Sequence, residues 1–251
     1  MSKHIKKFET EQAFDQWRQS QDCELPQLSW CVTENAIKSE ALITPPPHDY
    51  VEIGGIKWAT MNIGATAVTD SGLYFQWGDT QGYTEEQCGS GDGQKYFAWE
   101  DYKYSDGIYS YDIPGMTKYN HKDRKNILEP EDDAAHVNWG DNWRMPTVEE
   151  FRALRDAVSK EWTSSYEGSG VAGTICTDKS DSSKMLFFPA LGYCANGTVH
   201  NVGNAGYYWC SSLDSGDRYQ SGWKAEIITG IDSEIPYLRR TGLTVRGVLG
   251  E

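Results

Sequence analysis

The chain has 251 residues, a length that fits one large domain or one medium domain with an appendage. Its formal net charge of −14 at pH 7 disfavours nucleic acids and anionic membrane surfaces as partners, because like charges repel. The 10 Trp and 15 Tyr residues beside 25 Gly indicate a loop-rich fold with an aromatic core. No stretch approaches the ~18 apolar residues of a membrane span, so we expect no membrane insertion.

The N-terminal part of the sequence differs from the rest. Residues 1–44 are predicted to form a small module with a helix at Glu9–Ser20 followed by a hairpin. Three prolines at 45–47 predict a stiff linker, and residues 48–251 would form the main domain. Met1–Thr10 carries lysines without an apolar segment, so we expect no secretory signal and synthesis in the cytoplasm. The sequence also permits a homo-oligomer formed through the N-terminal module.

The main domain is predicted to be α+β, with antiparallel sheets and one main helix. Thr147 and Glu150 form a capping-box pattern, which predicts a helix from 147 to about 160. Hairpin turns are predicted at Gly54–Gly55 and Asn196–Gly197. The polar stretch 79–125 is predicted to be a long loop, either functional or braced by its own side chains. Further strands are predicted at 73–77, 185–189, 207–211, 222–228 and 243–248, with the last three neighbours in one sheet.

The sequence offers no convincing metal, cofactor or redox site. Its six cysteines lack C-x-x-C spacing, so free thiols are the default, and Cys194–Cys210 is the pair we would choose if any disulfide forms. The acidic residues 131–133 before His136, and the segment 178–183, lack metal-ligand spacing and are predicted to make hydrogen bonds in turns. We therefore expect no metal ligands, no catalytic residues and no cofactor.

A series of short motifs follows one order along the main domain. These motifs occupy residues 51–65, 74–79, 133–140, 143–147, 208–212 and 245–248. Together they resemble the Fibrobacter succinogenes major paralogous-type domain, a branch of the C-type-lectin-like fold that is related to formylglycine-generating enzymes. The C-terminal part is similar to the variable proteins of diversity-generating retroelements in gut Bacteroides and their phages. The resemblance implies structural roles for Trp143 and Arg246.

The resemblance implies a ligand- or receptor-binding protein and not an enzyme. Its context would be the surface of a bacteriophage virion, such as a tail fibre, with a host-cell surface protein or glycan as partner. Two alternatives stay open: a bacterial surface adhesin, and a formylglycine-generating-type cysteine enzyme. Relatives often have Ser where this chain has Cys210.

The candidate binding residues lie in the C-terminal part of the chain. They are Tyr207, Asp214, Ser215, Asp217, Arg218, Tyr219, Ser221, Trp223, Tyr237, Arg239 and Thr241. Tyrosine gives rigid contact area, and Ser and Asp give adaptable hydrogen bonds, as in antibody paratopes. An ordinary polar loop has a similar composition, and the resemblance favours the binding interpretation. We expect one exposed face to gather eight of these side chains: Tyr207, Asp214, Asp217, Arg218, Tyr219, Trp223, Tyr237 and Arg239. Trp223 would be a fixed aromatic residue on this face, because retroelement variation of AAC codons at adenine does not produce Trp.

Overall fold

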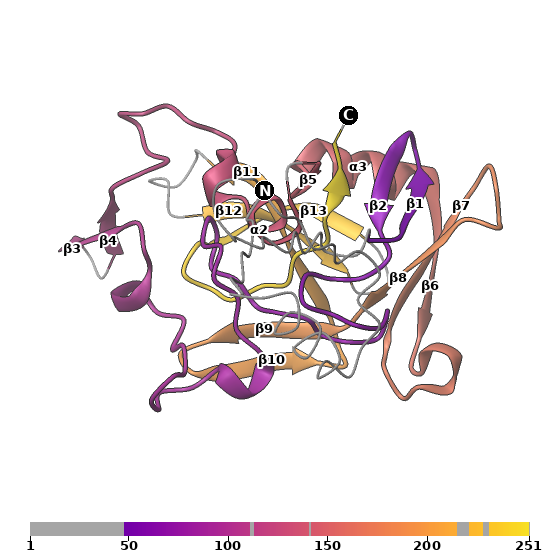
Figure 1. Ribbon diagram of the computed structural model, residues 1–251, viewed down its shortest axis with the longest axis horizontal. Helices are drawn as coiled ribbons and strands as arrows, with labels where there is room; N and C mark the ends of the chain where they lie inside the picture. The colour runs from indigo at the N-terminus through magenta and orange to yellow at the C-terminus, as the bar shows by residue number, and fades with distance from the viewer. Residues whose placement is uncertain (1–47, 111–112, 141, 215–220, 228–230, 251) are drawn as a thin grey trace, which may run out of the picture. The chain divides into compact units, whose positions relative to one another are not determined.

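The computed structural model of the protein describes residues 48–110, 113–140, 142–214, 221–227 and 231–250 (Figure 1). Contacts divide the chain into two units, Met1–Pro47 and His48–Glu251. The module expected at 1–44 and the linker at 45–47 lie outside the described residues. Among the described helices, none is long and apolar enough to cross a membrane.

The described unit is a sheet-rich α+β structure. Its five-stranded sheet has the order β10-β9-β11-β12-β13, with strands Thr198–Val202, Leu191–Ala195, Gly206–Asp214, Ser221–Ile227 and Ile231–Leu238. A four-stranded sheet has the order β1-β2-β14-β5, with strands Tyr50–Ile53, Ile56–Ala59, Val248–Leu249 and Trp143–Arg144. The smaller sheets are β6-β7-β8, at Val158–Thr163, Gly173–Asp178 and Met185–Pro189, and β3-β4, at Ser105–Ser110 and Ile113–Met116. The helices are α2 (Ala134–Trp139), α3 (Val148–Ala157) and the short 3-10 segments η1 (Glu85–Gln87), η2 (Trp99–Asp101), η3 (Pro130–Asp132) and η4 (Tyr166–Gly168).

The main helix, α3, begins where the sequence predicts. The Thr147 hydroxyl accepts a hydrogen bond from the Glu150 amide, and the Glu150 carboxylate accepts one from the Thr147 amide. This capping box satisfies amide groups that have no partner within the helix. The predicted end at about residue 160 is wrong. The helix ends at Ala157, because Val158 begins β6, which pairs with β7.

Both predicted hairpin turns are confirmed. Gly54 and Gly55 join β1 to β2, and Asn196 and Gly197 join β9 to β10. All four residues have positive φ, with 50° at Asn196 and 71° at Gly197, as a type I′ turn requires.

The order of strands in the C-terminal sheet differs from the prediction. β12 pairs with β13 (Ile231–Leu238), a strand that was not predicted from the sequence. The expected third strand, 243–248, instead makes isolated bridges through Leu243 and Thr244, and Val248 begins β14. β13 lies at the edge of its sheet, and an edge strand tolerates Pro236 because one side of it needs no hydrogen-bond partner. The strand predicted at 73–77 is likewise reduced to isolated bridges.

The central strand, β11, is buried on both faces. One face packs into a core cluster with Phe151 and Leu154 of α3, through Tyr208 and Cys210. The other face packs into an aromatic cluster through Tyr207 and Trp209. The sheet therefore lies between a helix and a layer of aromatic segments from the first half of the unit.

Indole hydrogen bonds fasten the aromatic layer to the sheet. Trp209 Nε1 donates to the Phe75 carbonyl at 2.8 Å, and Trp77 Nε1 donates to the Cys210 carbonyl at 2.9 Å. Gly222 makes room for this packing, since a Cβ there would lie 2.5 Å from the Trp77 ring. These contacts position the C-terminal strands and hence the candidate site.

Candidate functional site

Three tyrosines from three strands meet on one face of the five-stranded sheet. We call Tyr193 of β9, Tyr207 of β11 and Tyr237 of β13 the tyrosine cluster. The Tyr193 ring meets the other two edge to face, with centroids 5.2 Å from Tyr207 and 5.5 Å from Tyr237. Tyr193 and Tyr237 are half-buried, whereas Tyr207 is buried with 6 % of its surface exposed. Rings in this geometry brace one another and present rigid contact area.

A lysine lies within the tyrosine cluster. The Lys224 ammonium of β12 lies 4.5 Å from the centre of the Tyr207 ring and 4.8 Å from that of Tyr237. Glu226, two residues further along β12, pairs with this ammonium at 2.6 Å. The Lys224 side chain is only 1 % exposed, while 20 % of the Glu226 side chain is exposed. The Lys224 ammonium therefore occupies the position beside the Tyr207 and Tyr237 rings where a ligand cation could otherwise bind. The carboxylate of Glu226 is partly exposed to solvent.

Neighbouring polar groups continue this surface onto β10. The Asn201 side chain donates a hydrogen bond to the Tyr207 hydroxyl at 2.9 Å, and the His200 ring stacks on Tyr193. Burial raises the pKa of Tyr207 and Tyr237, so both hydroxyls stay protonated at neutral pH. The cluster thus offers hydroxyl, amide and carboxylate groups around aromatic rings, a combination suited to recognition by contact and hydrogen bonding.

The structure brings some of the predicted residues together. Tyr207 and Tyr237 belong to the tyrosine cluster, and the half-buried Asp214 ends β11 opposite Ser221. Ser221 in turn faces Leu238, so the connection between β11 and β12 starts and ends beside the end of β13. Four predicted residues in that connection lie outside the described residues: Ser215, Asp217, Arg218 and Tyr219.

The expectation that the eight residues named for the exposed face all lie there is wrong. Arg239 is completely buried: its guanidinium donates to the carbonyls of Lys118 and Tyr119 and lies 4.8 Å from the centre of the Trp77 ring. Thr241 and Ser221 are also buried, with 3 % and 6 % exposure.

Two further predicted residues also depart from that expectation. Trp223 lies on the opposite face of β12, where it packs against the core cluster of α3. Tyr207 belongs to a core cluster and has only 6 % of its surface exposed. Arg239 and Trp223 therefore contribute to the packing of the fold and not to an exposed face.

Sequence reasoning missed Tyr193, Lys224 and Glu226. Tyr193 was visible in the sequence as an aromatic residue in a predicted strand next to Cys194. The alternation of Lys224 and Glu226 with apolar residues in β12 is the pattern of a strand with one polar face. What the sequence did not contain was the register that places Lys224 between two tyrosine rings.

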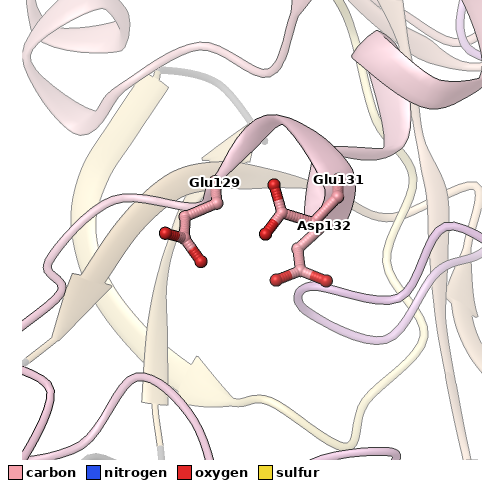
Figure 2. Close-up of side chains that lie close together, drawn as sticks. All are labelled: Glu129, Glu131 and Asp132. Atoms are coloured by element: carbon pink, nitrogen blue, oxygen red, sulfur yellow. The ribbon is translucent and has the colours of Figure 1, made fainter.

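A second group of charged residues lies at η3, where the carboxylates of Glu129, Glu131 and Asp132 come together (Figure 2). Their oxygens lie within 4.8 Å of one another. The Lys118 ammonium pairs with all three, at 2.6 Å from Glu129, 3.3 Å from Glu131 and 2.5 Å from Asp132. This ammonium supplies the positive charge that a metal ion would bring, so the cluster is a salt-bridge network. Asp133, next in the chain, caps α2 by accepting the amides of Ala135 and His136, in agreement with the predicted hydrogen-bonding turn.

Asp132 should make the stability of the protein depend on pH. Burial by itself would raise the pKa of its carboxyl, but hydrogen bonds from Lys118, Tyr104, Tyr119 and Lys103 outweigh burial and lower the pKa to about 2. The folded pKa is therefore below the unfolded one. The stabilisation is complete above about pH 4 and is lost as pH falls through 2.

We expect Asp132→Asn to lower the free energy of unfolding by about 2 kcal/mol at pH 7 and by progressively less toward pH 2. Urea unfolding at pH 7, 4 and 2.5 measures this difference, with Asp92→Asn on the exposed surface as control. If the free energies of unfolding of wild type and Asp132→Asn differed by the same amount at all three pH values, the lowered pKa of Asp132 would be contradicted.

The described cysteines are free thiols: Cys88, Cys176, Cys194 and Cys210. The pairing of Cys194 with Cys210 is wrong, because the two side chains belong to different core clusters. Burial raises the pKa of Cys176 to about 12 and also raises that of Cys210. A nucleophilic cysteine needs a lowered pKa and access to substrate. The buried Cys176 and Cys210 lack both properties.

Two hollows lie away from the tyrosine cluster. One, of about 400 Å³, is lined mainly by apolar atoms of residues that include Ile127, Trp143 and Met145. The other, between β1–β2 and Arg144, is more polar. Neither hollow is lined by a predicted binding residue. No known family model, curated protein or solved structure matches the chain.

Proposed function

We propose that this chain is a ligand- or receptor-binding protein with a C-type-lectin-like main domain. Its binding face would comprise the tyrosine cluster, Glu226 and the connection between β11 and β12. The observation that carries the proposal is the convergence of Tyr193, Tyr207 and Tyr237 beside Lys224, on strands that pack rigidly between α3 and the aromatic layer. Rigid scaffolds of this kind commonly present binding residues on adjacent loops.

The composition of residues 214–221 supports the same proposal. The segment contains Asp, Ser, Gly, Arg and Tyr, the residue types that paratopes use for adaptable polar contacts and rigid aromatic contacts. Its two ends are the half-buried Asp214 and the buried Ser221, which pair across β11 and β12. The sheet thus holds the two ends of the connection in register.

We place the protein on a phage virion, as a receptor-binding protein diversified by a retroelement. The resemblance of the C-terminal part to variable proteins of gut Bacteroides and their phages supports this context. Its partner would be a protein or glycan on the host-cell surface. The raised pKa values of Cys176 and Cys210 favour binding over the cysteine-enzyme alternative, which needs a reactive thiol.

Binding of the fluorescently labelled full chain to intact cells of a panel of gut Bacteroidetes strains tests this proposal. We expect saturable binding to a subset of strains, because a receptor is present in finite number and differs between strains. Pretreatment of the cells with periodate removes binding if the receptor is a glycan, and pretreatment with protease removes it if the receptor is a protein. The proposal would be contradicted if the protein bound every strain without saturation and no more strongly than an unrelated acidic protein.

A further inference from the structure

A short basic segment stands out in a chain whose net charge is −14. Residues 121–126 have the sequence HKDRKN. The side chains of Lys122 and Arg124 are exposed, and neither has an ion pair with another described residue, whereas the Lys125 ammonium pairs with Glu129 at 2.5 Å. Lys122 and Arg124 therefore present two uncompensated positive charges to solvent.

Hydrogen bonds fix the turn that carries these two cations. The half-buried Asp123 carboxylate accepts the amides of Tyr119 and Asn120 at 2.6 Å and 3.0 Å. The Arg124 amide donates to the Asn120 carbonyl at 3.0 Å, and Arg124 has a φ of 56°, in the left-handed region that residues other than glycine rarely adopt. Because the turn is already ordered, binding to it costs little further backbone freedom.

The basic turn leads directly to the end of β11. Asn126 follows Arg124 by two positions, and its carbonyl accepts the Leu213 amide at 2.8 Å. Ile127 forms an antiparallel bridge with Ser212. The turn is thus tied to the part of β11 from which the connection to β12 begins, at the border of the proposed binding face.

We propose that Lys122 and Arg124 form a cation patch that binds the anionic groups of a polysaccharide on the host-cell surface. This inference rests on the proposed binding function and adds the chemistry of the receptor to it. Ammonium and guanidinium groups make charge-assisted hydrogen bonds to carboxylates and phosphates, which are stronger than hydrogen bonds between neutral groups.

The polar character of the segment favours a polysaccharide over a folded protein as the partner. Residues 121–126 contain no apolar side chain. Interfaces between folded proteins bury a core that is depleted of charged residues. A hydrated polymer that carries anionic groups along its length can reach both cations without such a core.

The acidic character of the whole chain is compatible with this contact. At physiological ionic strength, charges on the surface are screened beyond about 8 Å. An anionic group beside Lys122 and Arg124 therefore interacts mainly with the charges of the turn. For the same reason, the Kd of the wild-type chain should rise as sodium chloride increases from about 0.05 M to about 0.5 M.

Charge reversal tests the patch on the full chain. The variant Lys122→Glu/Arg124→Glu is compared with Lys179→Glu/Lys184→Glu, which changes the net charge equally in the turn between β7 and β8. Binding is measured on protease-treated cells of a strain that the wild-type chain binds, so that polysaccharide remains as the partner. We expect the Kd to rise at least about tenfold for the first variant, mainly through slower association. The control should stay within about twofold of wild type, because distant charges are screened.

Urea unfolding of each variant verifies that it is folded, and the salt dependence of wild-type binding requires no variant. Equal effects of the two charge reversals, or a wild-type Kd that does not change with sodium chloride, would overturn the cation patch. Loss of wild-type binding after protease treatment would overturn the polysaccharide as partner. In each of these cases the wild-type chain still binds untreated cells, so the proposed binding function stands. Absence of wild-type binding to every untreated strain would overturn both proposals.

Discussion

Replacing Arg246 with Ala should lower the free energy of unfolding by about 4 kcal/mol or more. Arg246 is completely buried and joins separate parts of the chain. Its guanidinium donates to the Asn62 side chain at 2.8 Å and to the carbonyls of Ala59, Thr60 and Phe187 at 2.9–3.1 Å. Each acceptor that loses its donor in the interior costs about 1–3 kcal/mol.

Urea unfolding measures the loss in the free energy of unfolding. The dependence of this free energy on urea concentration should stay unchanged if the folded state keeps its compactness. The free energy of unfolding of Arg246→Lys should lie between those of Arg246→Ala and wild type. An ammonium keeps the charge, but it cannot donate to all the acceptors that the wider guanidinium reaches. Burial lowers the pKa of Arg246 to about 10, so the wild-type side chain is still charged at neutral pH. Arg155→Ala on α3 is the control and should change stability by no more than about 0.5 kcal/mol. An equal, small effect of both Ala variants would contradict the structural role of Arg246.

Features determined by nearby residues could be predicted from the sequence. Thr147 and Glu150 are three residues apart, and their capping box forms as predicted. The Asn196–Gly197 turn needs only two residues that adopt positive φ, and both do. In these cases the stabilising partners lie within a few positions of one another, so the local pattern contains the whole interaction.

Features that depend on long-range pairing could not be predicted. The strand β13 was not predicted from the sequence. Proline is incompatible with a central strand, and only the topology shows that Pro236 lies in an edge strand. The length of α3 was overestimated since pairing of Val158 with Asp178 competes with continuation of the helix.

The candidate site was predicted in part for the same reason. The pairing of β11 with β12 and β12 with β13 brings Tyr207 and Tyr237 onto one face, as hypothesised, although the strand that carries Tyr237 was not recognised. Arg239 was misplaced on the surface because an arginine is usually exposed. Here the carbonyls of Lys118 and Tyr119 and the Trp77 ring compensate for its burial. Such compensation comes from residues more than one hundred positions away.

The variant Arg218→Ala/Tyr219→Ala should lose most of the binding to host cells. Arginine and tyrosine are enriched among residues whose truncation costs 2 kcal/mol or more, so the pair should weaken binding by at least about 30-fold. Stability should change by no more than about 0.5 kcal/mol, because substitutions in polar connections rarely remove core contacts. Unfolding in urea measures stability on the same samples.

The matched control removes the same kinds of side chain from a different sheet. Tyr50→Ala/Lys57→Ala deletes one tyrosine ring and one cation from β1 and β2, where the Lys57 ammonium lies 5.5 Å from the centre of the Tyr50 ring. Both variants lose one positive charge, so a general electrostatic effect would weaken both equally. Specific recognition at the C-terminal face should affect the first variant alone.

The most direct test of the binding face is therefore the ratio of dissociation constants for wild-type protein and the two variants on the same host cells. The Kd should rise at least about 30-fold for Arg218→Ala/Tyr219→Ala and stay within about twofold of wild type for Tyr50→Ala/Lys57→Ala. Unchanged binding of the first variant, together with lost binding of the second, would contradict a binding face beside the tyrosine cluster.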